Sequence, residues 1–92
     1  MNLNIKQKEL VDFLFNKVKE KFPDIEFYNL TTSPDDREHI WINVIIEKEK
    51  DSSKISRYSS EFSVDILIDY GYQISVMPCN RKWAENYLSR AC

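Results

Sequence analysis

Hydrophobic positions in the first quarter of the chain recur with the period of an α-helix. Between Asn4 and Phe22 they form one apolar stripe, made of Leu10, Val11, Leu14, Phe15, Val18 and Phe22. Asn4 is a suitable N-cap residue, and Pro23 disfavours helical backbone at the residue before it. The pattern predicts a helix from about Asn4 to Phe22, with Phe13 off the stripe and at the surface.

The next two apolar segments have the length and composition of strands. Ile25–Leu30 is rich in β-forming residues and precedes a polar turn at Thr31–Glu38. Ile40–Glu47 alternates, and one of its faces is wholly apolar: Ile40, Ile42, Val44 and Ile46. Its other face is mixed: Trp41, Asn43 and Ile45. We therefore expect a central strand that is covered fully on one face and partly on the other, followed by a charged loop over Glu47–Lys54.

The remaining segments predict a helix, a strand and a closing helix. Ser56–Tyr70 is apolar over most of a helical circumference, and Gly71 suits the left-handed residue that ends such a helix. Tyr72–Met77 alternates as a strand, which we expect Pro78 to end. Asn80 is a suitable cap for a last helix from Arg81 to about Arg90, with an apolar stripe of Trp83, Ala84, Tyr87 and Leu88.

These elements follow in the order α-β-β-α-β-α, which places the chain in the α/β (α+β) class. The segment from Glu47 to Gly71 is long enough for a crossover, so the second and third strands are expected to be parallel. The first two strands are free to pair in either direction. We predict a small three-stranded mixed sheet with helices packed on it, in a single compact domain of residues 1–92.

Composition excludes several classes of function. The chain has 92 residues, of which 42% are hydrophobic and 30% charged, and Gly71 is its one glycine. A glycine-rich phosphate-binding loop is therefore excluded. With a net charge of −2 and no apolar run of membrane length, we expect neither a nucleic-acid nor a membrane partner. Cys79 and Cys92 fit no zinc or redox motif, so we expect no metal or cofactor and two reduced thiols in a cytoplasmic protein.

Several segments together resemble the minimal nucleotidyltransferase fold. They are the helix end Lys-Glu-Lys-Phe-Pro at Lys19–Pro23, the strands Ile-Glu-Phe-Tyr-Asn-Leu and Trp-Ile-Asn-Val-Ile-Ile, and the segment Ile66–Val76. Trp83 falls where members of that family often carry a bulky residue. The resemblance covers most of the chain and consists of a shared order of helices and strands.

The resemblance implies an activity whose chemical groups this sequence lacks. The family uses a Gly-Ser turn for the triphosphate and paired carboxylates that hold divalent metals. Here the turn falls near Leu30–Thr32, which has no glycine, and the paired acids fall on Ile40 and Ile42. The chain is therefore either a catalytically empty version of the fold or a different family with the same topology.

Three further groups of residues each allow a functional interpretation and a plainer structural one. Glu61, Asp65 and Asp69 lie on one helix face, which is either a metal or partner site or simply a solvated surface. His39 lies beside an acidic turn (Asp35, Asp36 and Glu38), which is either an acid–base site or a polar loop. Cys79 opens the last helix, where it is either a reactive thiol or an ordinary half-buried cysteine.

The surplus of aromatic residues favours binding over catalysis. A core this small need not bury Phe13, Trp41 and one of Tyr28, Tyr58 or Tyr70, and aromatic side chains are enriched at interfaces. With the acidic row they give a possible interaction surface: Phe13, Trp41, Glu61, Asp65 and Asp69. We expect a non-catalytic domain that contacts another protein or itself as a homodimer. One alternative is a degenerate nucleotidyltransferase-like nucleotide binder or enzyme with a rearranged acidic site, for which Asp35, Asp36 and Asp65 are the candidates. Another is a fragment of a larger assembly.

Overall fold

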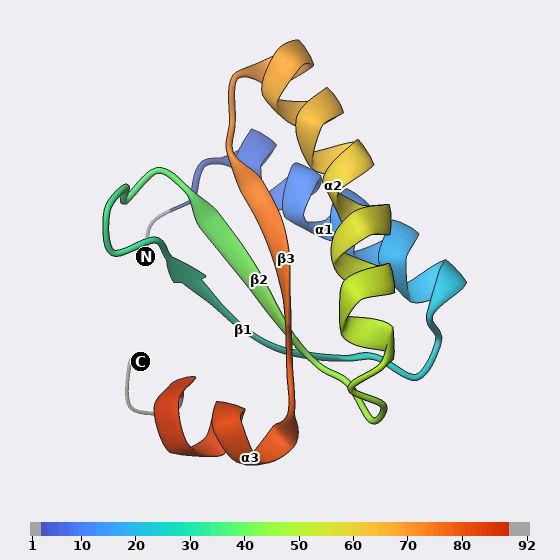
Figure 1. The fold of residues 1–92 in the computed structure, drawn as a ribbon. Coiled ribbons are helices and arrows are strands. Elements are labelled where there is room, and N and C mark those ends of the chain that lie inside the picture. Colours follow the sequence, from blue (N-terminus) through green and yellow to red (C-terminus); the bar gives the residue numbers. More distant parts are fainter. Residues whose placement is uncertain (1–2, 89–92) are drawn as a thin grey trace.

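A computed structural model describes residues 3–88, which form helices around a small sheet (Figure 1). The elements follow in the predicted order. They are α1 (Ile5–Lys21), β1 (Glu26–Thr32), β2 (Ile40–Ile45), α2 (Asp51–Tyr70), β3 (Ile74–Cys79), α3 (Arg81–Trp83) and a π-helical turn, Ala84–Leu88. The predicted α+β class is confirmed.

The sheet is mixed, with β2 at its centre. β1 pairs with β2 in the antiparallel direction, and the register shifts between Phe27 and Asn29, so that Tyr28 lies in a bulge. β2 and β3 are parallel, as predicted from the length of the segment between them, because α2 carries the chain back across the sheet.

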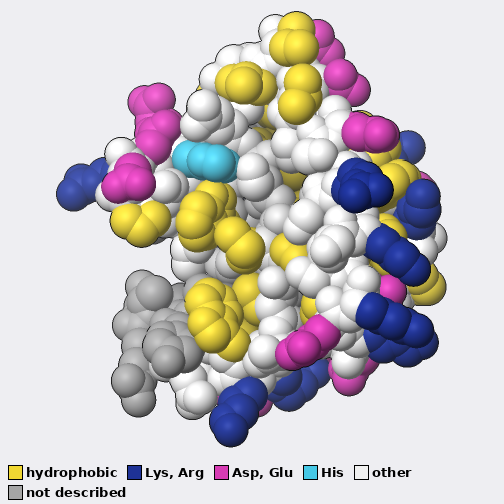
Figure 2. Space-filling model, viewed as in Figure 1, with side chains coloured by type: hydrophobic (Ala, Val, Ile, Leu, Met, Phe, Trp, Pro, Cys, Tyr) yellow, Lys and Arg dark blue, Asp and Glu magenta, His cyan; other side chains and the backbone are white. Residues whose placement is uncertain are grey.

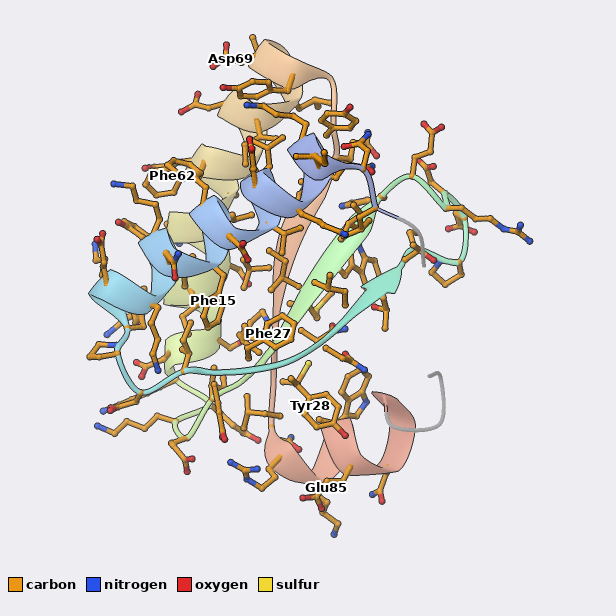
Figure 3. The ribbon with its side chains drawn as sticks, turned by 180° about the vertical axis from the view of Figure 1, so that it is seen from behind. Phe15, Phe27, Tyr28, Phe62, Asp69 and Glu85 are labelled. Carbon is orange, nitrogen blue, oxygen red and sulfur yellow. The ribbon has the colours of Figure 1, made fainter. Side chains whose placement is uncertain are left out.

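Both long helices cover the same face of this sheet, which is the near face in the view of Figure 3. α1 contributes Leu10, Val11, Leu14 and Val18 to the core. The strands contribute the predicted apolar face of β2, together with Ile74 and Val76 of β3. The main core therefore lies between the helix layer and one face of the sheet.

Local signals fix the ends of both long helices. The Asn4 side chain accepts a hydrogen bond from the Gln7 amide at 2.7 Å, and the Gln7 side chain accepts one from the Asn4 amide at 3.0 Å, which completes a capping box. Gly71 ends α2 with φ of 77°, the predicted left-handed conformation. The predicted start of α2 at Ser56 is wrong, since the helix begins at Asp51 and takes in part of the expected loop. Ile55, which is 1% exposed, joins the core from this additional turn.

Two predictions about the last third of the chain also need correction. β3 does not end before Pro78 but runs to Cys79, which an edge strand permits because its outer amide positions need no partner. The last helix is short and continues as a π-helical turn; residues 89–92, and the side chains of Tyr87 and Leu88, lie outside the described residues. Asn80 caps it as predicted, through a 2.7 Å hydrogen bond from the Trp83 amide.

Within residues 3–88, no helix combines the length and the apolar sequence that a membrane span requires.

Candidate functional site

A groove of about 600 Å³ runs along the surface between α1 and α2. Its apolar lining consists of Leu10, Phe13, Phe62, Ile66 and Tyr70. Leu10 and Ile66 are buried and form part of the core, whereas Phe13 is 44% exposed. The groove is therefore a place where the apolar interior of the helix layer reaches the solvent.

Aromatic side chains form a continuous row along the seam between the two helices. Phe13 meets Phe62 edge-to-face with ring centroids 6.2 Å apart, and Phe62 meets Tyr58 at 5.2 Å. Tyr58 in turn meets Phe22 at 6.1 Å. Each pair has the edge-on geometry that the ring quadrupole favours, so the row makes a preformed surface.

The two helices run in opposite directions along this seam. Lys6 lies over the Tyr70 ring at 4.5 Å, and Lys21 lies over the Tyr58 ring at 4.5 Å. Between these two contacts, Phe13 meets Phe62. The start of α1 thus lies beside the end of α2 (Figure 3).

The rims of the groove differ in charge. The α1 rim carries Lys6, Glu9 and Lys17, and Lys6 forms an exposed ion pair with Glu9 at 3.6 Å. The α2 rim carries Asp65 and Asp69. One side of the groove is therefore mainly basic and the other acidic.

The structure brings together three of the five residues that the sequence nominated as an interaction surface. Phe13, Asp65 and Asp69 all line the groove. Glu61 lines a neighbouring hollow of about 620 Å³ farther along the seam, beside Lys54 and Arg57. Trp41 does not join them, because it lies on the opposite face of the sheet. Phe13 is exposed as predicted, but it also packs on Phe62, a contact that its position off the stripe of α1 did not reveal.

The opposite face of the sheet combines aromatic and polar groups. His39 Nε2 and Ser75 Oγ are hydrogen-bonded at 2.8 Å, and the His39 ring meets Trp41 edge-on at 5.9 Å. Figure 2 shows hydrophobic side chains gathered around the histidine on this face. Asp35, Asp36 and Glu38 are exposed on the turn before His39. The imidazole therefore contacts side chains of both β2 and β3.

Asn43 is a buried polar residue that sequence reasoning did not single out. Its side chain is fully buried, and its Nδ2 donates to Asn29 Oδ1 at 2.9 Å and to Thr31 Oγ1 at 3.0 Å. Its Oδ1 atom has no hydrogen-bond partner in the described residues. The signal was present in the sequence: an amide in the middle of an otherwise apolar strand requires partners on the neighbouring strands.

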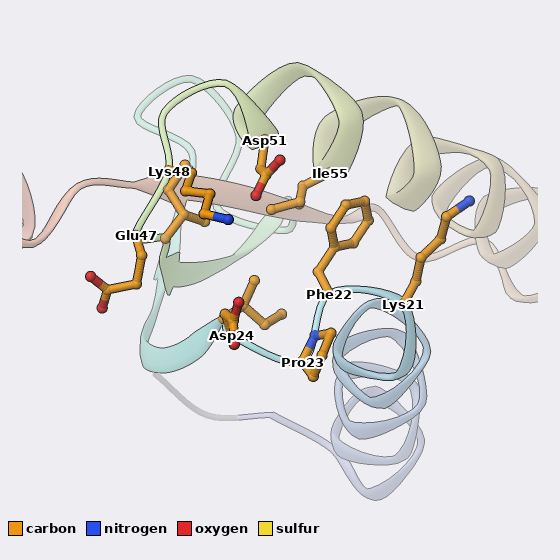
Figure 4. A pocket seen from close by; sticks show the side chains of 10 residues that line it. Lys21, Phe22, Pro23, Asp24, Glu47, Lys48, Asp51 and Ile55 are labelled. Carbon is orange, nitrogen blue, oxygen red and sulfur yellow. The ribbon is translucent and has the colours of Figure 1, made fainter.

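A smaller hollow of about 200 Å³ lies where the α1–β1 turn meets the loop between β2 and α2 (Figure 4). Ile25, Ile46 and Ile55 line its interior, and Asp24 and Asp51 face it from the two connections. Among the residues that the structure describes, no group of three or more His, Cys, Asp or Glu side chains could hold a metal ion.

Cys79 is buried rather than activated. Burial raises the pKa of the Cys79 thiol from 9.0 to about 11, whereas a helix N-terminus acting on an accessible thiol would lower it. Its Sγ donates to the Met77 carbonyl at 3.4 Å. The interpretation as a reactive thiol is therefore not supported, and Cys79 belongs to a small cluster with Ile45 and Ala84.

Comparison of the chain with models of protein families, with curated proteins and with solved structures found no match.

Proposed function

We propose that this domain acts through protein–protein contacts made in the α1–α2 groove. The observation that carries the proposal is an apolar groove with a preformed aromatic row, bordered by charged residues of both signs. Interfaces typically have an apolar centre with aromatic anchors and a polar rim. Phe13 and Phe62 would provide the anchors, and Lys17 and Asp65 would orient the partner from the two rims.

The distribution of exposed apolar side chains supports this choice of surface. In residues 3–88, eight large hydrophobic side chains are exposed, and six of them lie on α1 or α2: Ile5, Phe13, Val64, Leu67, Ile68 and Tyr70. Exposed apolar surface that is gathered on one layer is typical of an interaction site. The helix layer is therefore the part of the molecule that gains most from being covered.

A photo-crosslinking amino acid tests this proposal directly. Benzoylphenylalanine in place of Phe13 would lie in the groove, and the same substitution at Phe27 is a matched control. Phe27 is 47% exposed, close to the 44% of Phe13, and it likewise packs edge-on against one other phenylalanine, Phe15. In the cells that produce the protein, we expect discrete crosslinked species from position 13 and none from position 27. An absence of crosslinks from position 13 in a folded, expressed variant would show that the proposal is wrong.

Nucleotide binding is a second candidate, favoured by Asp65 and Asp69 on one rim of the groove opposite Lys6 and Lys17. Carboxylates hold Mg²⁺, and lysines bind phosphates. In the nucleotidyltransferase-like alignment the acidic positions are instead Ile40 and Ile42, which are buried beneath the helices at 1% and 0% exposure. A thermal-shift assay with ATP, CTP and GTP plus Mg²⁺ separates the candidates, because a specific ligand raises the melting temperature. We expect no shift at millimolar nucleotide.

A further inference from the structure

We propose that a second copy of this chain occupies the α1–α2 groove, packed about a two-fold axis that runs along the groove. This inference rests on the proposed function and names its partner. In such a pair, α1 of each copy covers α2 of the other, and the four helices form a compact bundle between two outer sheets.

Symmetry explains why the charges of the groove suit a second copy. A two-fold axis along the groove exchanges its two sides without reversing its direction, so each rim meets the opposite rim of the partner. Lys6 lies beside the end of α2, and it would therefore face the region of the second copy's Asp69. Lys17, farther along α1, would face the region of Asp65 or Glu61. The mainly basic rim thus meets an acidic rim twice in one interface.

The other simple arrangement places like charges together. A two-fold axis across the groove would lay α1 on α1 in opposite directions, which brings Lys6 of one copy towards Lys17 and Lys21 of the other. Repulsion between these lysines disfavours it. Among the charged residues that line the groove, Lys6, Lys17, Asp65 and Asp69 therefore favour the axis along it.

The helix layer is also large enough for such an interface. A stable dimer buries about 800 Å² per partner, which is about an eighth of the 6240 Å² accessible surface of this chain. The molecule extends over 32 × 29 × 21 Å, and one broad face supplies that area. Covering this layer would remove Phe13 and Val64, which are 44% and 53% exposed, from water.

Paired charge reversals test the symmetry itself. Lys6→Glu/Lys17→Glu makes both rims acidic, and Asp65→Lys/Asp69→Lys makes both basic. Alone, each variant opposes like charges across the groove, and we expect its dimer to dissociate about 100-fold more readily than the wild type. Mixed together, the two variants place opposite charges on both sides, and we expect a heterodimer. The measurement is sedimentation equilibrium at micromolar concentration, with circular dichroism to verify that each variant is folded.

A control and two contrary outcomes complete the experiment. Lys48→Glu/Lys82→Glu changes the net charge by the same amount at exposed positions outside the groove, and it should leave the dimer intact. A wild-type chain that sediments as a monomer, or folded variants that fail to form a heterodimer when mixed, would overturn the inference. Crosslinks from position 13 separate the two proposals: an adduct of twice 11.0 kDa whose crosslinked peptide comes from α2 supports the second copy. Adducts only with other proteins would overturn this inference and leave the proposed function standing.

Discussion

The two faces of β2 lie on the same six-residue strand, yet different kinds of interior cover them. On the helix side, Ile42 and Val44 are fully buried in a large apolar cluster formed with α1 and α2. On the other side, Ile45 belongs to a small cluster with Cys79 and Ala84, and Asn43 is buried among hydrogen-bonding side chains. The helix side can gain stability from apolar burial alone, whereas the other side also depends on polar groups finding partners.

This difference explains how so short a chain positions its groove. Because the large cluster ties α1 and α2 to the sheet, the helices are fixed relative to each other, and Phe13 and Phe62 meet at a defined place. The small cluster holds the short last helix, where Arg81 also pairs with Glu26 of β1 on the surface. The helix layer is thus the more rigidly supported of the two regions.

Removing one side chain from each face gives the largest expected contrast. Ile42→Ala should lower the free energy of unfolding by about 3–5 kcal/mol, because the surrounding cluster cannot close the cavity. Ile45→Ala should cost about 2 kcal/mol, because the short helix beside it can shift to fill the space. Urea denaturation measures both values. Equal losses, or a greater loss at Ile45, would contradict the proposed difference between the two faces of β2.

The next largest loss of stability is expected from removing the side-chain amide of Asn43. Asn43→Ala should lower the free energy of unfolding by about 2 kcal/mol, since it removes the two hydrogen bonds that the buried Nδ2 atom donates. Asn43→Leu combined with Thr31→Val removes one donor and acceptor together and should cost less than Asn43→Ala alone. Denaturation of Asn43→Leu, Thr31→Val and the double variant measures the coupling between the two side chains. If the double variant were the less stable, the polar contacts would not be what Asn43 contributes.

Gly71 sets the turn from α2 into β3, and its replacement should have a smaller effect. No other residue's atoms lie within 4 Å of a Cβ built at this position, so Gly71→Ala would test the positive φ of 77° alone. We expect a loss of about 1 kcal/mol, the ordinary cost of the left-handed conformation for a residue with a Cβ. Gly71→Asn is the matched control and should cost less, because asparagine tolerates this conformation better. Thermal unfolding distinguishes them.

The sequence predicted those features of the fold that short-range patterns control. The Asn4 cap, the end of α2 at Gly71 and the parallel pairing of β2 with β3 all follow from local chemistry or segment length. The start of α2 was missed because Asp-Ser-Ser-Lys at Asp51–Lys54 is as polar as a loop. The spacing of Ile55, Ser59, Phe62 and Ile66 along one helix face nevertheless begins one residue before the predicted start at Ser56.

The groove was predictable only in part. The exposed Phe13 and the acidic row on α2 were visible in the sequence as separate features. Their meeting depends on how α1 and α2 are rotated about their axes, which the packing of both helices on the sheet decides. Trp41 was grouped with them by residue type, although the alternation of Ile40–Glu47 places it on the face opposite to the apolar one, where it is half-buried in the structure.

The smallest expected effect concerns the thiol of Cys79, whose reactivity can first be measured without a substitution on either face of β2. At pH 8 a thiol of pKa about 11 has about 100-fold less thiolate than one of pKa 9.0, and the thiolate is the form that reacts. In a Cys92→Ser background, alkylation by iodoacetamide should therefore be slow in the folded protein and rise with pH towards 11. Ile45→Ala should accelerate alkylation, because it loosens the small cluster around Cys79. When the two variants are compared at the same free energy of unfolding, Ile42→Ala should accelerate alkylation less. Rapid alkylation of the folded wild type at pH 8 would show instead that the cluster around Cys79 opens readily, and that this face of the sheet is held less firmly than its burial indicates.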